Sequence, residues 1–150
     1  MSATIAALTP HPAATWDDAL ALLRIRNACA AWMTGDPRQL SAADQRRWWG
    51  SAARRRSAIW LFRDAGGAAA GFGLLRMRAG RWEATLGLLP EWRGRGHGVA
   101  IYRHLIAHCP GDLYIDVLLG NTRSAEAAKR AGFVVCDWTG ALVTLVARRR

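Results

Sequence analysis

The spacing of apolar side chains in the first half of the chain predicts two helices followed by three strands. From Thr15 to Met33 apolar residues recur every three or four positions, and Gly35-Asp36-Pro37 end the pattern. Ser41 is a good cap for a second helix running to about Arg54. Strand-like runs separated by turn residues follow at residues 58–63, 70–77 and 81–89, and Ile5 to Leu8 is a candidate for an earlier strand.

The second half alternates helix and strand before a closing hairpin. Val99 to Cys109 places apolar residues on one helical face, and Pro110-Gly111 end it. The pattern then predicts a buried strand at residues 113–119, a short helix after Asn121, and a hairpin formed by residues 133–138 and 141–147. With no repeat and no linker, residues 1–150 are expected to form a single α/β domain.

A glycine-rich loop lies between the third of these strands and the helix that follows it. Residues 92–98 read Trp-Arg-Gly-Arg-Gly-His-Gly. Closely spaced glycines let backbone N–H groups approach an anion, and a helix N-terminus adds a favourable dipole. The P-loop signature is absent, and a dinucleotide fingerprint would require glycine where Val99 stands. The loop therefore predicts a phosphate site of another kind.

Two motifs resemble those of the GCN5-related N-acetyltransferase (GNAT) superfamily. Arg93 to Gly98 read R-x-x-G-x-G, similar to the family's acyl-CoA pyrophosphate loop, and Asn121 to Phe133 read N-x-x-S-x-x-x-x-K-x-x-G-F. The resemblance implies an α/β (α+β) fold with a mixed, mostly antiparallel sheet of six to seven strands and about four helices. It also implies a V-shaped splay between the fourth and fifth strands. The implied reaction is acetyl transfer from acetyl-CoA to a primary amine by direct attack in a ternary complex.

The resemblance also assigns residues to the acyl donor. A backbone N–H near Leu88 would polarise the thioester carbonyl. Glu83 would take the amine proton, although a surface carboxylate paired with arginine explains it equally well. Relatives commonly place a tyrosine seven residues after the motif asparagine, where this chain has Ala128. The residues implied to hold the donor are Leu88, Leu89, Arg93, Gly94, Arg95, Gly96, His97, Gly98, Val99, Asn121 and Ser124.

Without this tyrosine, more than one residue is a candidate to donate a hydrogen bond to the leaving thiolate. Ser124 is the first candidate as its hydrogen-bond donor, Tyr114 is a second, and Ser124 as a simple helix cap is the structural alternative. Asn121 would order the slot. His97 is expected to face solvent in the loop, and His104 and His108 are expected at the surface.

The acceptor is indicated only by the first two helices. Arg26, Asn27 and Trp48 resemble positions beside the acceptor in amino-sugar acetyltransferases, so an amino sugar, a nucleotide-linked sugar, or a protein or peptide amine is expected. Packing of these side chains onto the sheet is the alternative interpretation. A polyamine is disfavoured because it would need a carboxylate-rich cleft, and the chain has 11 acidic residues.

The net charge of +10 raises a second class of function. A basic surface attracts nucleic acid, and a non-catalytic acyl-CoA sensor or nucleic-acid-associated protein of the same fold stays open as the alternative. The arginines are scattered, with no recognition helix, so nucleic acid is not favoured. No membrane span, signal peptide or metal-ligand spacing is evident, and three cysteines are expected as buried free thiols in the cytoplasm of a monomer or homodimer.

Overall fold

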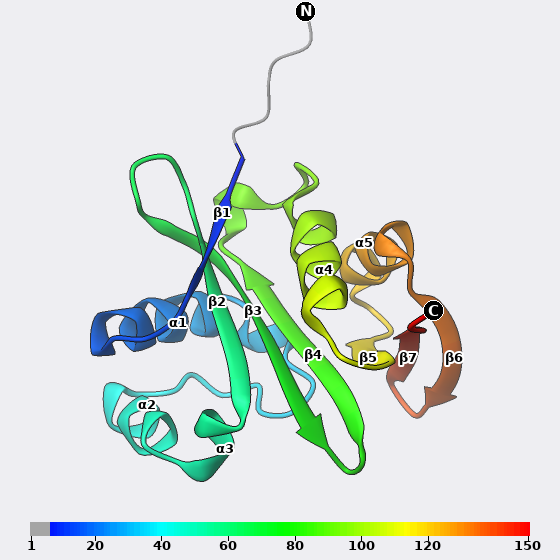
Figure 1. The fold of residues 1–150 in the computed structure, drawn as a ribbon, viewed down its shortest axis with the longest axis horizontal. Coiled ribbons are helices and arrows are strands. Elements are labelled where there is room, and N and C mark those ends of the chain that lie inside the picture. The colour runs from blue at the N-terminus through cyan, green and yellow to red at the C-terminus, as the bar shows by residue number, and fades with distance from the viewer. Residues whose placement is uncertain (1–6) are drawn as a thin grey trace, which may run out of the picture.

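One twisted seven-stranded sheet organises the protein (Figure 1). The computed structural model describes residues 7–150. The strands lie in the order β1-β2-β3-β4-β5-β7-β6 and are antiparallel except for β4 and β5. Their bounds are β1 Thr9–Pro12, β2 Ser57–Arg63, β3 Ala69–Arg78, β4 Arg81–Leu88, β5 Leu113–Leu118, β6 Val134–Thr139 and β7 Leu142–Ala147.

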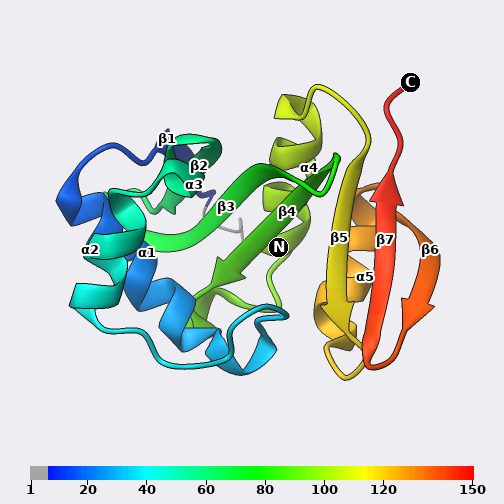
Figure 2. The ribbon, with the colours of Figure 1, turned by 90° about the horizontal axis from the view of Figure 1, so that it is seen from below.

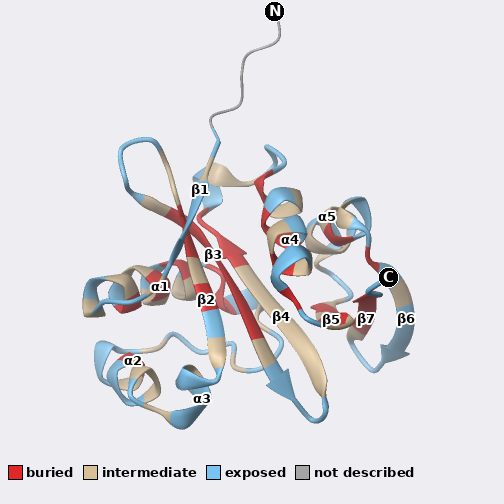
Figure 3. Cartoon of the chain, in the orientation of Figure 1, coloured by how far each residue is buried: buried red, intermediate tan, exposed pale blue. Residues whose placement is uncertain are grey.

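Helices cover both faces of this sheet (Figures 1 and 2). They are α1 Trp16–Ala28, α2 Ala42–Trp49, α3 Ala52–Arg55, α4 His97–His108 and α5 Thr122–Ala131, with 3₁₀ turns at Ala30–Trp32 and Pro90–Trp92. The core on the α1 side contains Leu22, Ile25, Phe72 and Leu74, and the core on the α4 side contains Ile101, Leu105, Leu113 and Phe133. Buried residues accordingly line β3 between the two helical layers (Figure 3).

The sheet opens between β4 and β5. These two parallel strands pair only at Trp82–Leu113 and Glu83–Tyr114, whereas β3 and β4 pair at eight positions. Beyond Glu83 the strands separate, which Figure 2 shows as a widening gap between two ribbons that start side by side. The predicted V-shaped splay between the fourth and fifth strands is confirmed, as is the mostly antiparallel sheet.

Most helix starts are fixed by side-chain caps. Thr15, Ser41, Ser51 and Asn121 each accept a hydrogen bond from a backbone N–H in the first turn of the helix that follows. Gly96 precedes α4 with a left-handed backbone and no side-chain cap. Among the described α-helices, α4 is thus the one that begins with its first N–H groups free of a side-chain partner.

Several element boundaries differ from expectation for local reasons. The first helix ends at Ala28 and continues as a 3₁₀ turn. The second is broken at Gly50, because the Ser51 side chain caps a separate short helix, which gives five helices rather than four. The candidate strand Ile5 to Leu8 falls partly outside the described residues, and the first strand is found at Thr9–Pro12. No helix within residues 7–150 is long and apolar enough to cross a membrane.

Three single-residue expectations are wrong. Cys136 is exposed on the edge strand β6, whereas Cys29 and Cys109 are buried free thiols as expected. His104 is half-buried because its ring packs edge-on against Trp60, with ring centroids 4.8 Å apart. His97 is buried rather than solvent-facing, because it is the first residue of α4 and packs against Trp92 with ring centroids 5.3 Å apart.

Tight packing between the sheet and α4 at Gly71 predicts a stability loss on substitution. A Cβ at Gly71 would lie 2.8 Å from Leu88, 2.9 Å from the Gly87 carbonyl and 3.2 Å from Ile101. We expect Gly71→Ala to lower the free energy of unfolding by about 1–3 kcal/mol in chemical denaturation. Gly35→Ala is the matched control, because nothing lies within 4 Å of its added Cβ. Equal stability of the two variants would contradict this packing.

Candidate active site

A large cavity follows the opening between β4 and β5 and continues beneath the segment that joins α1 to α2. Its volume is about 1290 Å³. One half is lined by the ends of the two strands, the glycine loop and the first turns of α4 and α5. The other half is lined by β3, β4 and the segment from Trp32 to Trp48. The cavity thus joins two compartments, one beside the glycine loop and one beside α1 and α2.

Backbone amides of β4 face the first compartment. The Leu89 N–H donates to the Ala70 carbonyl of β3 (2.9 Å), so this amide is occupied within the sheet. Because successive peptide groups of a strand point to opposite sides, those of Leu88 and Leu86 point away from β3. The Leu88 carbonyl accepts from Arg93 Nε (3.0 Å) and from the Cys29 thiol (3.3 Å). No β5 residue pairs with Leu86 or Leu88, so their N–H groups face the slot.

The glycine loop brings free N–H groups to the same compartment. Gly94 and Gly96 have φ angles of 76° and 86°, a left-handed conformation that residues with side chains rarely adopt. Gly94, Gly96, Gly98 and Val99 line the cavity, as does Arg93, while Leu89, Arg95 and His97 do not. Arg95 is exposed beside the loop. The uncapped N-terminus of α4 together with this loop forms a cradle suited to a phosphate group.

Two hydroxyl groups meet on the opposite wall of the slot. Tyr102 of α4 and Ser124 of α5 lie 2.7 Å apart, and both line the cavity. Burial raises the pKa of Tyr102 to about 12, so its phenol stays protonated and able to donate. Asn121 accepts from the Ser124 N–H (3.4 Å) and is therefore the cap of α5, which leaves the Ser124 hydroxyl free for another partner. Ala128, at the position where the family resemblance leads to the expectation of a tyrosine, is fully buried.

An ion-pair cluster forms the floor of the second compartment, at the closed end of the V. Glu83 of β4 lies opposite Arg76 of β3, and its carboxylate contacts Arg81 at 3.2 Å, Arg76 at 3.8 Å and Arg78 at 4.0 Å. Arg81 also pairs with Asp116 of β5 (3.2 Å), and Asp116 accepts from the Thr144 hydroxyl (2.6 Å). The Glu83 side chain is 15% exposed. Glu83, Asp116 and Arg76 line the cavity, whereas Tyr114 lies beneath the Arg81 guanidinium and does not.

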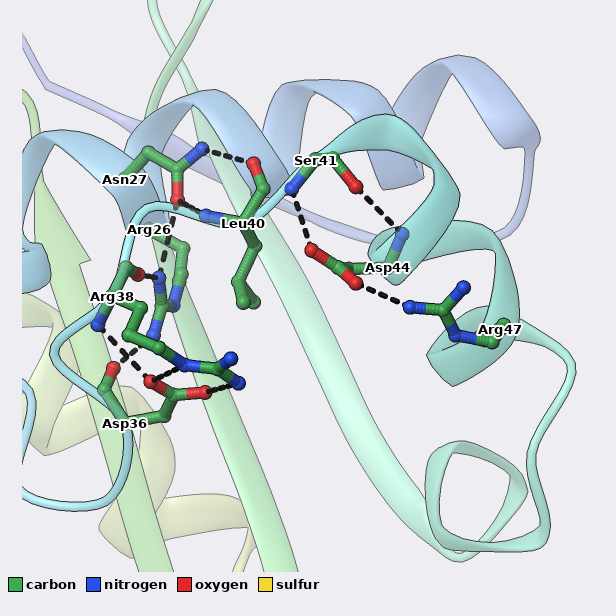
Figure 4. A network of polar contacts seen from close by, with 8 residues as sticks. All are labelled: Arg26, Asn27, Asp36, Arg38, Leu40, Ser41, Asp44 and Arg47. Carbon is green, nitrogen blue, oxygen red and sulfur yellow. Dashed lines mark hydrogen bonds and ion pairs between the residues drawn. The ribbon is translucent and has the colours of Figure 1, made fainter.

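The wall above this floor is held by polar contacts from the end of α1 (Figure 4). Asn27 binds both the N–H and the carbonyl of Leu40 at 2.9 Å, and Arg26 donates to the carbonyls of Asp36 and Arg38. The side chains of Arg26 and Asn27, which were expected beside the acceptor molecule, therefore use these polar groups to order the segment before α2. Arg26 and the half-buried Trp48 line the cavity, while Asn27 lies behind it.

The acidic side chains on this wall already have arginine partners. The Asp36 carboxylate accepts from Arg38 (2.7 Å), and this contact holds the pKa of Asp36 well below its usual range. Asp44 caps α2 together with Ser41 and pairs with Arg47 (Figure 4). No group of three or more side chains able to hold a metal ion occurs among residues 7–150.

The sequence over this architecture matches a known family model. Residues 19–133 match the model of the acetyltransferase (GNAT) family. The matched residues include the glycine loop and line both compartments of the cavity. The chain belongs to the GNAT acetyltransferase family. A search of the curated proteins found no match to the sequence.

Solved structures of other GNAT proteins share this fold at low sequence identity. A GCN5-related N-acetyltransferase from Kribbella flavida is 20% identical, with a TM-score of 0.77 over 95% of this chain and 98% of that one. A phosphinothricin acetyltransferase from Sinorhizobium meliloti, solved with acetyl-CoA, is 18% identical, with a TM-score of 0.75 over 95% and 88%. AAC(6')-Ib, solved with paromomycin and acetyl-CoA, is 18% identical, with a TM-score of 0.79 over 95% and 94%.

Two residues of this GNAT site escaped sequence reasoning. Tyr102 falls within the helix predicted from Val99 to Cys109, where the apolar pattern alone does not distinguish it, although a buried tyrosine usually needs a hydrogen-bond partner. Arg76 was hidden among the many arginines of the chain. The available signal is a polar side chain within a predicted helix or strand, buried in the case of Tyr102 and half-buried in the case of Arg76.

The burial of His97 makes the stability of the protein depend on pH. Burial, with a contribution from Arg95, lowers the pKa of His97 below its ordinary value of 6.5. The unfolded chain therefore binds a proton more readily, so the free energy of unfolding falls as pH falls below about 6.5. We expect His97→Phe, which keeps an aromatic ring against Trp92, to flatten this dependence in melts between about pH 7.5 and 5.5. The exposed His11→Gln is the control, and an unchanged slope for His97→Phe would contradict the assignment.

Proposed function

We propose that the protein transfers an acetyl group from acetyl-CoA to the primary amine of a small molecule by direct attack in a ternary complex. One observation carries the proposal: the open strands, with unpaired amides, lead straight to an uncapped helix preceded by glycines with left-handed backbones. The structures of relatives solved with acetyl-CoA support the same donor. Acetyl-CoA supplies the thioester carbonyl, and residues of this chain bind the donor, polarise the thioester and accept the amine proton.

The residues present fit acetyl-CoA. The N–H groups around Gly94, Gly96 and Gly98, at the positive end of the α4 dipole, would hold the pyrophosphate. Backbone groups of Leu86 and Leu88 would hold the pantetheine amides, in the place a neighbouring strand would take. The Leu89 amide is engaged by Ala70 and is left out of this set, and Arg93 acts by tying the end of β4 to Cys29.

Polarisation of the thioester falls to the unpaired amides of β4. An N–H fixed in a strand needs no reorganisation when negative charge develops on the carbonyl oxygen, which is why such contacts accelerate acyl transfer. Leu86 and Leu88 provide two such donors on the slot side. Which of the two N–H groups meets the thioester carbonyl oxygen depends on how deeply acetyl-CoA sits in the slot.

Glu83 is the proposed acceptor of the amine proton. It lies at the closed end of the slot, lines the cavity and is the carboxylate nearest to the sheet opening on β4. The arginines around it fix its position rather than leaving it mobile at the surface. Because Glu83 lies three residues, about 10 Å of strand, before Leu86, the amine proton would reach it through bridging water molecules rather than by direct contact.

The Tyr102–Ser124 pair is proposed to assist the leaving thiolate. Either hydroxyl of this pair can donate to the other. When Tyr102 donates, the Ser124 proton is free for a hydrogen bond into the slot. The pair thereby replaces the phenol that Ala128 cannot supply. Asn121 supports it by fixing the first turn of α5.

We also propose the class of the acceptor and the location of the protein. A small-molecule amine is favoured, because the ordered segment before α2 forms a wall along one side of the second compartment. The buried free thiols of Cys29 and Cys109 support the cytoplasm as its location. A non-catalytic acyl-CoA sensor is the second candidate, supported by the absence of tyrosine at Ala128. Absence of product with every amine, despite CoA binding, would favour it.

Binding of CoA should depend on the backbone of Gly96. At about 100-fold its dissociation constant, CoA should stabilise the protein by about 2.7 kcal/mol, which a thermal melt detects readily. We expect Gly96→Val to abolish this shift. Gly67→Val is the matched control, because Gly67 has a nearly identical φ of 89° in the β2–β3 turn, with nothing within 4 Å of an added Cβ. An equal CoA shift in both variants would rule out the loop as the pyrophosphate site.

Catalysis should depend on both hydroxyls of the Tyr102–Ser124 pair. We expect Ser124→Ala to lower kcat about 100-fold, and Tyr102→Phe to lower it less, with the KM for acetyl-CoA unchanged. Rates are measured as thiol release with the best acceptor from a panel of amino sugars, amino acids and peptides. Tyr114→Phe is the control, because Tyr114 does not line the cavity. A rate lost in Tyr114→Phe and kept in Ser124→Ala would transfer the role to Tyr114.

A further inference from the structure

Arg76 is the cation in the floor of the second compartment, where the acceptor would bind, that lines the cavity and has an unpartnered Nε. Its Nε is buried and has no hydrogen-bond partner within residues 7–150. The nearest carboxylate oxygen, Glu83 Oε2, is 3.8 Å away, beyond hydrogen-bond distance. Arg76 nevertheless lines the cavity, and 41% of its side chain is exposed. Arg76 can therefore donate hydrogen bonds to a molecule in the cavity.

The other arginines of this compartment are already committed. Arg26 donates to backbone carbonyls, Arg38 pairs with Asp36, and Arg47 pairs with Asp44. In the floor itself three guanidinium groups, from Arg76, Arg78 and Arg81, face two carboxylates, from Glu83 and Asp116. The floor thus carries a surplus positive charge, and Arg76, the cation of the three that lines the cavity, lies beyond hydrogen-bond distance of both carboxylates.

The position of Arg76 sets how far the charge lies from the reacting centre. Arg76 stands opposite Glu83, three residues before Leu86 on β4. Three residues of strand span about 10 Å. An acceptor whose amine reaches the slot beside Leu86 would extend back along β4 and place its far end over Arg76.

We propose that the acceptor is a primary amine that carries an anionic group, a carboxylate or a phosphoryl-type group, several bonds from the amine, and that Arg76 binds this anion. The inference rests on the proposed acetyl transfer and names its substrate class. Arginine matches such planar or tetrahedral oxyanions with two parallel N–H donors. A polycationic acceptor would meet the surplus positive charge and is disfavoured.

Matched pairs of acceptors test the charge directly. The acids are ω-amino carboxylates with one to five methylene groups, and each is compared with its uncharged amide, using acetyl-CoA and thiol release. We expect the best acid to exceed its amide in kcat/KM by about 10- to 100-fold, the effect of one charge-assisted hydrogen-bonded contact. In Arg76→Gln the acid and the amide should become equal, and Arg76→Lys should keep part of the preference.

Controls separate this inference from the enzyme assignment. Arg56→Gln, at an exposed position before β2, removes the same charge and should keep the acid preference. CoA-dependent thermal stabilisation of Arg76→Gln shows that the variant is folded and binds the donor. Equal turnover of acids and amides by the unaltered protein would overturn the anionic acceptor and leave acetyl transfer standing. Turnover of no amine of either class would overturn both.

A binding measurement gives the same answer without turnover. Glutarate, which has two carboxylates and no amine, is titrated into the CoA complex by calorimetry. We expect binding that is lost in Arg76→Gln and kept in Arg56→Gln. Loss in both variants, or binding unaffected by Arg76→Gln, would contradict the assignment.

Discussion

The incomplete pairing of β4 with β5 is the constraint on which the site depends. A buried strand must satisfy its backbone groups, and an unpaired N–H costs free energy unless another partner takes the place of the missing strand. Here the ladder stops after Glu83–Tyr114 while both strands continue. The antiparallel pairing on their outer sides, to β3 and β7, keeps the two strands rigid as they separate. The slot is thus built from strands that are ordered but unpaired on one side.

The same principle operates at the start of α4. Among the described residues, four α-helices begin with a side chain that accepts a hydrogen bond from an N–H of the first turn, and α4 begins with a glycine that cannot. The two places where the backbone is left open, the slot side of β4 and the N-terminus of α4, are joined by the short segment from Leu89 to Gly96 and line one cavity. The unsatisfied backbone groups therefore lie at the ligand site. Elsewhere side chains form hydrogen bonds with free backbone groups, as Asn27 does with the N–H and carbonyl of Leu40.

Sequence reasoning succeeded where a local pattern determines structure and failed where contacts are distant. Pro90 and the glycines of residues 94–98 indicate the end of β4 and the loop by their own backbone preferences, and apolar runs bounded by turn residues predict the strands. The break at Gly50 depends on one serine cap, which a continuous helical pattern hides. The hydrogen bond between Tyr102 and Ser124 joins residues 22 positions apart, and the pairing of Arg76 with Glu83 requires the register of a hairpin. Neither is visible before the strands and helices are placed.

Amide hydrogen exchange followed by NMR, with and without CoA, examines the open strand residue by residue. If the donor takes the place of the missing strand, CoA will slow exchange at the Leu86 or Leu88 N–H and at the N–H groups of residues 96–98. The Leu89 N–H, already bonded to Ala70, will change little. Unchanged exchange at Leu86, Leu88 and residues 96–98 in a CoA-saturated sample would show that the donor binds elsewhere and that the opening of the sheet is not its site.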